Sequence, residues 1–260
     1  MNMMKRTNNY LASVAMMLLL VMLSSVGAWA QSEVVSIGNT DKSDGSLPID
    51  QYSKYSLTQQ IYTKDEINHA AGKITSIAFY GYDYGMERTC DVYLSPTTKN
   101  AFESNTDWVK VAPEDKVFSG HITVYNGLWS IIDFDTPYEY DGKSNLLVTV
   151  DDNTNAANSS TVYWGVFIAS GNQALYYSKR YSTPVNLDPT QSIEESGVYY
   201  GRKNCIQLCF ETNPKPYKLE AVEVGDKDHG SCPITQFIPG EHGLYLCLIL
   251  GEWCQAFDEL

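Results

Sequence analysis

A run of carboxylate and amide side chains follows a strongly apolar segment in the middle of this sequence. The segment 146–150 reads LLVTV, and Asp151, Asp152, Asn153 and Asn155 come directly after it. Oxygen ligands at such close spacing suit Ca²⁺. The pattern differs from an EF-hand loop because the glycine and the terminal glutamate are missing. Two interpretations stay open: a calcium site at the end of a buried strand, or an ordinary polar turn.

Three tryptophans are candidates for stacking against a sugar ring. Trp and Tyr side chains supply large contact areas at low cost in conformational entropy. Trp164 lies close to a loop and is the best surface candidate, while Trp108 follows a turn. Trp129 alternates with Ile131, which favours a place in the core. We predict ligand-binding roles for Trp164 and Trp108, with core packing of the aromatic residues as the alternative.

Residues of the types used in catalysis are scattered along the chain. Asp133 and Asp135 are a carboxylate pair of the kind that glycoside hydrolases use, but the sequence gives no distance between them in space. His69 and His121 stand alone, with no Ser or Cys nucleophile motif around them. We therefore predict no catalytic residue and no enzymatic activity.

An even number of cysteines, six here, suggests a disulfide framework in a secreted chain, but the strand pattern argues against one. The absence of a CxxC pair argues against a zinc site. Cys90 shares the apolar face of the stretch 89–95 and is expected to pack as a small core residue. Cys205 and Cys209 fall on the polar face of the stretch 204–211. Four strand steps separate them by about 13 Å, beyond the roughly 7 Å that a disulfide can bridge. We predict that these two do not pair with each other.

The first thirty residues have the pattern of a secretory signal peptide. Lys5 and Arg6 precede the apolar run Leu11–Leu23, and small residues at Ala28 and Ala30 predict cleavage after Ala30. The alternative is a membrane anchor, but the run is shorter than the roughly 20 apolar residues of a span. We expect a secreted, extracellular or cell-surface protein without a membrane span in its mature chain.

Composition limits the partners. The chain has 18 basic and 31 acidic residues, a net charge of −13, and becomes more acidic once Lys5 and Arg6 leave with the leader. Such a chain repels nucleic acid and anionic lipid surfaces. The 19 tyrosines suit extracellular binding surfaces, and equally the core of a β-sandwich. We expect an extracellular glycan or protein as the partner.

Residues 31–212 contain many short β-type segments separated by turn signals. Asn126-Gly127 predicts a hairpin between the stretches 117–125 and 128–134. Thr63 and Glu66 form a capping box for a short helix that ends near Gly72. Together the segments favour an all-β fold, a jelly-roll, galactose-binding-like β-sandwich. The expected strands are 33–37, 52–62, 73–82, 89–95, 117–125, 128–134, 146–150, 162–168, 174–177 and 204–211.

The order of these segments resembles a β-sandwich module of secreted Bacteroidetes proteins that is related to gingipain-type cleaved adhesin domains. The resemblance covers most of the mature chain. It implies a jelly roll used for adhesion to glycans or proteins, stabilised by Ca²⁺ and without catalytic activity. The matching pieces are 47–49, 55–62, 72–80, 91–94, 106–109, 117–120, 137–142, 146–153 and 171–176.

The pattern breaks after Asn213. Residues 213–227 look like a linker and the first strand of a fibronectin type III-like domain, a fold that needs roughly 100 residues. Residues 228–260 are irregular and hold three of the six cysteines. We hypothesise a frameshift or truncation soon after Lys227.

The sequence as a whole predicts a secreted, non-catalytic, adhesin-like binding module for glycan or protein ligands. One alternative is an accessory domain cut from a secreted peptidase or glycoside hydrolase. The other is a spacer domain with a purely structural role.

Overall fold

The computed structural model describes residues 31–180 and 185–212, together with the backbone of four short strands nearer the C-terminus. Contacts divide the chain into two compact units between Asn213 and Pro214. The regular secondary structure among the described residues of the first unit is almost all β-strand, which confirms the predicted all-β class. The signal peptide predicted for residues 1–30 lies outside the described residues and stays a prediction.

In the second unit, the described strands form two antiparallel pairs. The pairs are β14 (Glu223–Val224) with β15 (Cys232–Pro233), and β16 (Leu246–Leu248) with β17 (Trp253–Gln255). Most of residues 213–260 lie outside the described part of the chain. The linker, the fibronectin-like strand and the frameshift therefore stay predictions.

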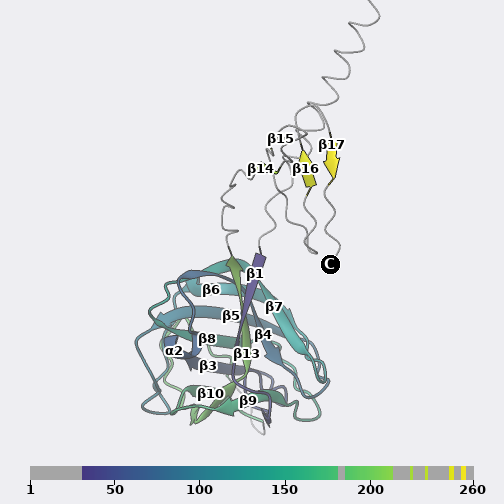
Figure 1. Ribbon diagram of the computed structural model, residues 1–260. Helices are drawn as coiled ribbons and strands as arrows, with labels where there is room; N and C mark the ends of the chain where they lie inside the picture. The colour runs from purple at the N-terminus through teal and green to yellow at the C-terminus, as the bar shows by residue number, and fades with distance from the viewer. Residues whose placement is uncertain are drawn as a thin grey trace, which may run out of the picture. The chain divides into compact units, whose positions relative to one another are not determined.

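Two antiparallel sheets form the body of the first unit (Figure 1). The four-stranded sheet has the order β1 (Gln31–Ile37), β13 (Ile206–Thr212), β4 (Gly72–Tyr80) and β7 (Trp129–Tyr140). The six-stranded sheet has the order β11 (Val198–Tyr200), β10 (Ala174–Ser178), β3 (Ser56–Tyr62), β8 (Asn145–Asp152), β5 (Arg88–Thr97) and β6 (Lys116–Ile122). A third, small sheet has the order β12 (Arg202–Asn204), β9 (Trp164–Ile168) and β2 (Lys42–Asp44).

The main hydrophobic core lies between the two large sheets, as in a β-sandwich. Alternate residues of β13 and β5 both contribute to it, among them Leu208 and Val92. Cys90 belongs to the same cluster, which confirms its predicted place in the core. Side chains of successive strand residues point to opposite faces, so each of these strands also presents an outer face.

The outer face of the six-stranded sheet is partly covered by loops. A second cluster of buried residues, with Tyr93, Leu147 and Leu175 among its members, packs there against Phe102 and Val111 of the following loop. Strand β8 is consequently buried along its whole length, as its apolar sequence predicted. Strand β3 is also buried on both faces, although its sequence SLTQQIY contains several polar residues.

The predicted hairpin at Asn126-Gly127 is wrong. Gly127 does take a positive φ of 73° in a turn, but the strands on either side belong to different sheets: β6 pairs with β5, and β7 pairs with β4. The turn therefore carries the chain from one layer of the sandwich to the other. A short-range turn signal does not specify which strand becomes the hydrogen-bonded neighbour.

The predicted capping box is present at the start of α2 (Lys64–Ile67). The Thr63 side chain accepts from the backbone of Glu66, whose carboxylate accepts from the backbone of Thr63. The helix ends earlier than predicted, because Asn68 and not Gly72 takes the left-handed conformation, with φ of 45°. Asn shares this tolerance for positive φ with Gly.

The cysteines near β13 follow the prediction only in part. Cys90, Cys205 and Cys209 are free in the described residues, in agreement with the prediction that Cys205 and Cys209 do not pair. Cys205, expected on a polar face, is buried, and its Sγ lies 2.7 Å from the backbone oxygen of Asn39. It precedes β13, so the alternation of that strand does not extend to it.

Candidate functional site

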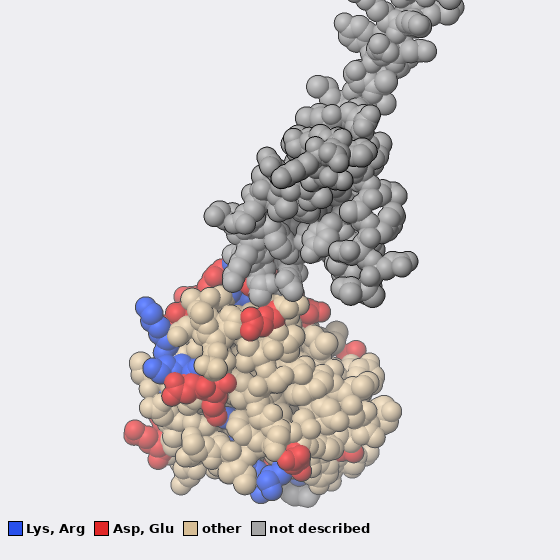
Figure 2. Space-filling model, viewed as in Figure 1, with Lys and Arg blue, Asp and Glu red and all other residues tan. Residues whose placement is uncertain are grey.

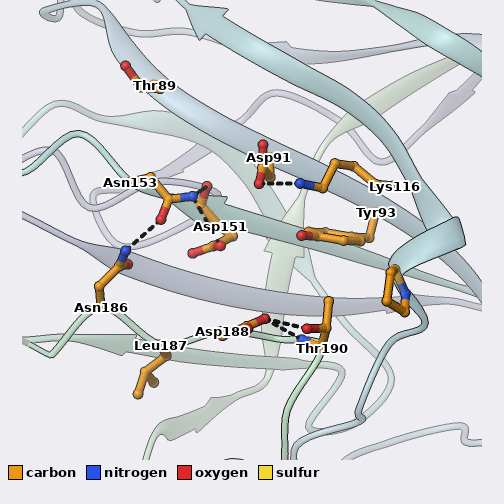
Figure 3. Close-up of a pocket in the computed structure, with 11 residues that line it drawn as sticks. Thr89, Asp91, Tyr93, Lys116, Asp151, Asn153, Asn186, Leu187, Asp188 and Thr190 are labelled. Carbon is orange, nitrogen blue, oxygen red and sulfur yellow. Dashed lines mark hydrogen bonds and ion pairs between the residues drawn. The ribbon is translucent and has the colours of Figure 1, made fainter.

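A pocket of about 600 Å³ opens on the outer face of the six-stranded sheet (Figure 3). Its floor consists of side chains from β5, β6 and β8, and its wall comes from the loop residues 186–190. The lining is rich in carboxylate, hydroxyl and amide groups. The lining residues are Thr89, Asp91, Tyr93, Pro113, Lys116, Asp151, Asn153, Asn186, Leu187, Asp188 and Thr190.

Strand periodicity explains why these side chains meet. On β5, Cys90 and Val92 face the main core, so Thr89, Asp91 and Tyr93 face outward into the pocket. The neighbouring strand β8 places its own residues beside them, and the backbone register pairs position 91 with position 151. Two aspartates therefore lie directly opposite each other on adjacent strands.

One of these aspartates is neutralised by a lysine. Lys116 of β6 donates to Asp91 Oδ2 at 2.7 Å, and its Nζ also lies 5.4 Å from the centre of the Tyr93 ring. The hydrogen bond to Asp91 raises the pKa of Lys116, so the lysine stays charged. Burial raises the pKa of the Tyr93 hydroxyl, which stays protonated and can donate.

The other aspartate lies deeper and has neutral partners. Asp151 is 5 % exposed, and its Oδ2 accepts from the Asn153 amide at 3.1 Å. Asn186 donates in turn to Asn153 Oδ1 at 2.7 Å. Burial is the main cause that raises the pKa of Asp151 to about 7, and the carboxylates of Asp91, Asp152 and Asp188 add to the rise.

The wall of the pocket is a loop that is fixed at several points. The Val111 amide donates to the Pro189 carbonyl at 3.0 Å, and Pro189 is buried. Asp188 accepts from the backbone and the hydroxyl of Thr190, at 2.9 and 2.6 Å. The Asp188 carboxylate is exposed and completes the third acidic position of the pocket.

The structure separates the four residues predicted to bind calcium. Asp151 and Asn153 line the pocket, but Asp152 points to the opposite face of β8. There Asp152 is held by the guanidinium of Arg88, and neither side chain is exposed. Asn155 is exposed, has a φ of 56° and does not line the pocket. The four oxygen-bearing side chains thus do not converge on one point.

The structure reverses the predicted roles of two tryptophans. Trp164, predicted at the surface, is fully buried in the main core. It packs edge-on against Phe79, with 6.4 Å between the ring centroids. Trp129, predicted in the core, is partly exposed and contacts the Tyr80 ring at 5.4 Å on the outer face of β4 and β7. Its neighbour Ile131 is 66 % exposed on that face.

Trp108 does not line the pocket. It is partly buried, packs against the second hydrophobic cluster and donates from Nε1 to the Glu195 carbonyl at 2.8 Å. Trp108 thus links the loop 98–112 to the segment near Gly197. These contacts place it as a structural support of the loops.

Sequence reasoning missed most of the pocket. Asp91, Tyr93, Lys116 and Asp188 are far apart in the chain and were not candidates. The alternation in the stretch 89–95 did place Thr89, Asp91 and Tyr93 away from the core. Their convergence with Asp151 depends on the strand order β6–β5–β8, which no local signal specifies.

Acidic groups are not confined to this pocket. Asp133 and Asp135 are exposed along the outer face of β7. Figure 2 shows acidic side chains at several separate places on the face in view, among a larger area of neutral residues. Among residues 31–180 and 185–212, no helix is long and apolar enough to cross a membrane.

Comparisons with protein-family models, with curated proteins and with solved structures found no match to this chain. The resemblance to adhesin domains of secreted Bacteroidetes proteins therefore stays a prediction.

Proposed function

We propose that this chain is an exported, non-catalytic, adhesin-like module that binds a saccharide in the pocket over β5, β6 and β8. The observation that carries the proposal is the lining of that pocket. Hydroxyl, amide and carboxylate groups stand side by side around about 600 Å³, a volume within the range of small-ligand sites. Such a density of donors and acceptors matches the many hydroxyl groups of a sugar.

Several features of the pocket support binding in particular. The floor lies on three paired strands, which fix side-chain positions before a ligand arrives, and preorganisation lowers the entropic cost of association. The Tyr93 ring offers an aromatic surface in a polar surrounding. Asp91 is bound by Lys116, so one of the three carboxylates already serves as a structural acceptor.

A glycan array probed with the mature chain, residues 31–260, tests the proposal. We expect binding to a restricted set of glycans, and a loss of at least about tenfold in affinity for Tyr93→Ala and Asn153→Ala. Asp133→Asn, an exposed change on the other sheet, serves as the matched control. The proposal is wrong if no glycan binds, or if the pocket variants bind as well as the control.

Two further arms of the same experiment address the predicted cofactor and the predicted lack of catalysis. Loss of binding in EDTA with recovery in Ca²⁺ would support calcium in the site, and binding that persists in EDTA would assign recognition to the side chains alone. Oligosaccharides that bind are also incubated with the mature chain, and the mixture is assayed for new reducing ends. Release of reducing ends would contradict a non-catalytic module and favour a glycoside hydrolase.

A further inference from the structure

We infer that the ligand of this pocket carries an organic cation, a primary ammonium or a guanidinium group, which sits against Asp151 and Asp188. The inference rests on the proposed function, because it names the chemical class of ligand for the same pocket. It starts from the charges on the lining. Three carboxylates face the pocket, and Lys116 is the one basic side chain among its lining residues.

The positive charge of Lys116 is already paired with the carboxylate of Asp91. Its ammonium group lies 2.7 Å from Asp91 Oδ2, in a pair that is more buried on the aspartate side than on the lysine side. Asp151 and Asp188 accept hydrogen bonds from Asn153 and Thr190, which are neutral. Within residues 31–180 and 185–212, neither of these two carboxylates has a cationic partner. The pocket is therefore short of positive charge.

The burial of Asp151 makes the lack of a positive charge in the pocket unfavourable. A carboxylate that is 5 % exposed has lost most of its hydration, and an ionised group in that position needs a counter-charge or takes up a proton. Other groups face Asp151 from the packed elements: Asp91 and Lys116 from β5 and β6, and Asp188 from the loop. Behind β8, Arg88 is committed to Asp152. None of these residues supplies the missing charge.

The shape of the pocket favours an organic cation over a bare metal ion. About 600 Å³ is far more than one ion fills, and it matches a ligand of several carbon atoms. In Figure 3 the Tyr93 ring lies below the Lys116 side chain, with Asp151 to one side of it. An aromatic ring near a desolvated ammonium adds a favourable cation–π contact. Asn153 and Asn186 leave hydrogen-bonding capacity for the uncharged part of the ligand.

Paired probes that differ only in charge test the inference. Calorimetry on the mature chain at pH 7 compares glucosamine with N-acetylglucosamine, and galactosamine with N-acetylgalactosamine. We expect each free amine to bind at least about tenfold more tightly than its neutral partner. Binding of the amine should also release protons, because a cation beside Asp151 favours its ionised form. Repeating the titration in buffers of different ionisation enthalpy measures that release.

Two variants test whether these carboxylates cause the preference for the amine. Asp151→Asn should remove both the amine preference and the proton release, and Asp188→Asn, on an exposed loop, should reduce the preference without endangering the fold. Circular dichroism confirms folding, and Asp133→Asn is the control on the other sheet. A preference that survives in both variants would overturn the inference.

The outcomes separate the inference from the proposed function. If neutral sugars bind and amines have no advantage, the organic cation is wrong and the saccharide module stands. If 1,5-diaminopentane or an N-acetyl-lysine amide binds while every sugar fails, the cation site stands and the saccharide proposal is wrong. If Ca²⁺ alone binds and releases the proton, and amines do not, the site belongs to the metal and the inference fails.

Discussion

Asp151 and Asp152 are neighbours in the chain, yet they have opposite surroundings. Asp152 faces inward, where the Arg88 guanidinium and the Thr154 hydroxyl bind its carboxylate. Asp151 faces the pocket, where its partner is a neutral amide. Burial raises the pKa of both carboxyls, but only at Asp152 does a positive charge act against the rise. The inner face has a completed ion pair, and the outer face has an acid that lacks one.

This difference distinguishes a group that maintains the fold from a group available for binding. The charges of Asp152 and Arg88 are satisfied within the domain, together with the carbonyl of Ser53 that Arg88 also contacts at 2.8 Å. Asp151 retains an unsatisfied charge at a surface that a ligand can reach. Substitutions on the two faces should therefore differ in size and in pH dependence.

The largest effect is expected on the inner face. Arg88→Met leaves the Asp152 carboxylate buried without its counter-charge, and such breaks cost about 3–5 kcal/mol in the free energy of unfolding. Urea unfolding at neutral pH measures the loss. A loss below about 1 kcal/mol would show that the pair is solvated and would remove the contrast between the two faces. The double variant Arg88→Met, Asp152→Leu should recover much of the stability, since no buried charge remains.

An intermediate effect is expected at Asp151, where substitution should increase the free energy of unfolding and not decrease it. Its pKa in the folded protein is about 7, above the value of about 3.9 in an unfolded chain. The folded state therefore binds the proton more tightly, and the free energy of unfolding decreases as pH rises from about 4 to 7. Asp151→Asn does not titrate, so the variant should be more stable than the wild type at pH 8, by at most about 4 kcal/mol.

Unfolding curves collected between pH 4 and pH 8 measure this difference. The stabilities of wild type and Asp151→Asn should converge at pH 4, where the wild-type carboxyl is protonated. Asp152→Asn is the matched control, because it unpairs Arg88 and should destabilise the fold at neutral pH. Parallel pH profiles for wild type and Asp151→Asn would contradict the assignment of a raised pKa.

The smallest effect is expected for the pair at the edge of the pocket. Lys116→Met removes a partly exposed ion pair, which is worth about 1 kcal/mol or less. Asp91 then loses its counter-charge, so the pKa of Asp151 should rise further. Carbon-detected NMR titration of the aspartate carboxyl groups follows that pKa. An unchanged pKa of Asp151 would show that Asp91 does not act on it.

Much of the fold could be predicted from local patterns. The alternation in the stretch 89–95 placed Cys90 in the core, and the apolar run of β8 indicated a strand buried on both faces. The capping box at Thr63 was also local, since its hydrogen bonds join residues three apart. Each of these features depends only on residues that are close together in the chain, so it can be recognised from the sequence alone.

The errors arose where the result depends on tertiary pairing. Strand β7 has apolar residues on both faces, so Ile131 suggested a core role for Trp129, although Ile132 is the residue that faces the core. The Asn126-Gly127 turn was real, but the neighbours of β6 and β7 are distant strands. The pocket itself combines β5, β6, β8 and a later loop, so no single stretch of sequence contains its pattern.

The pairing of β1 with β13 has a mechanical consequence. Position 31 is the partner of position 212, so the entry and exit of this unit lie at the same end of one antiparallel pair. A pulling force applied at these two points acts across the hydrogen bonds at that end and breaks them one after another, like a zipper. Two strands pulled apart from one end separate at low force, because each hydrogen bond between them carries the load in turn. If this unit is held by both flanks, it would therefore open first by the separation of β1 from β13, while the pocket on the other sheet stays intact.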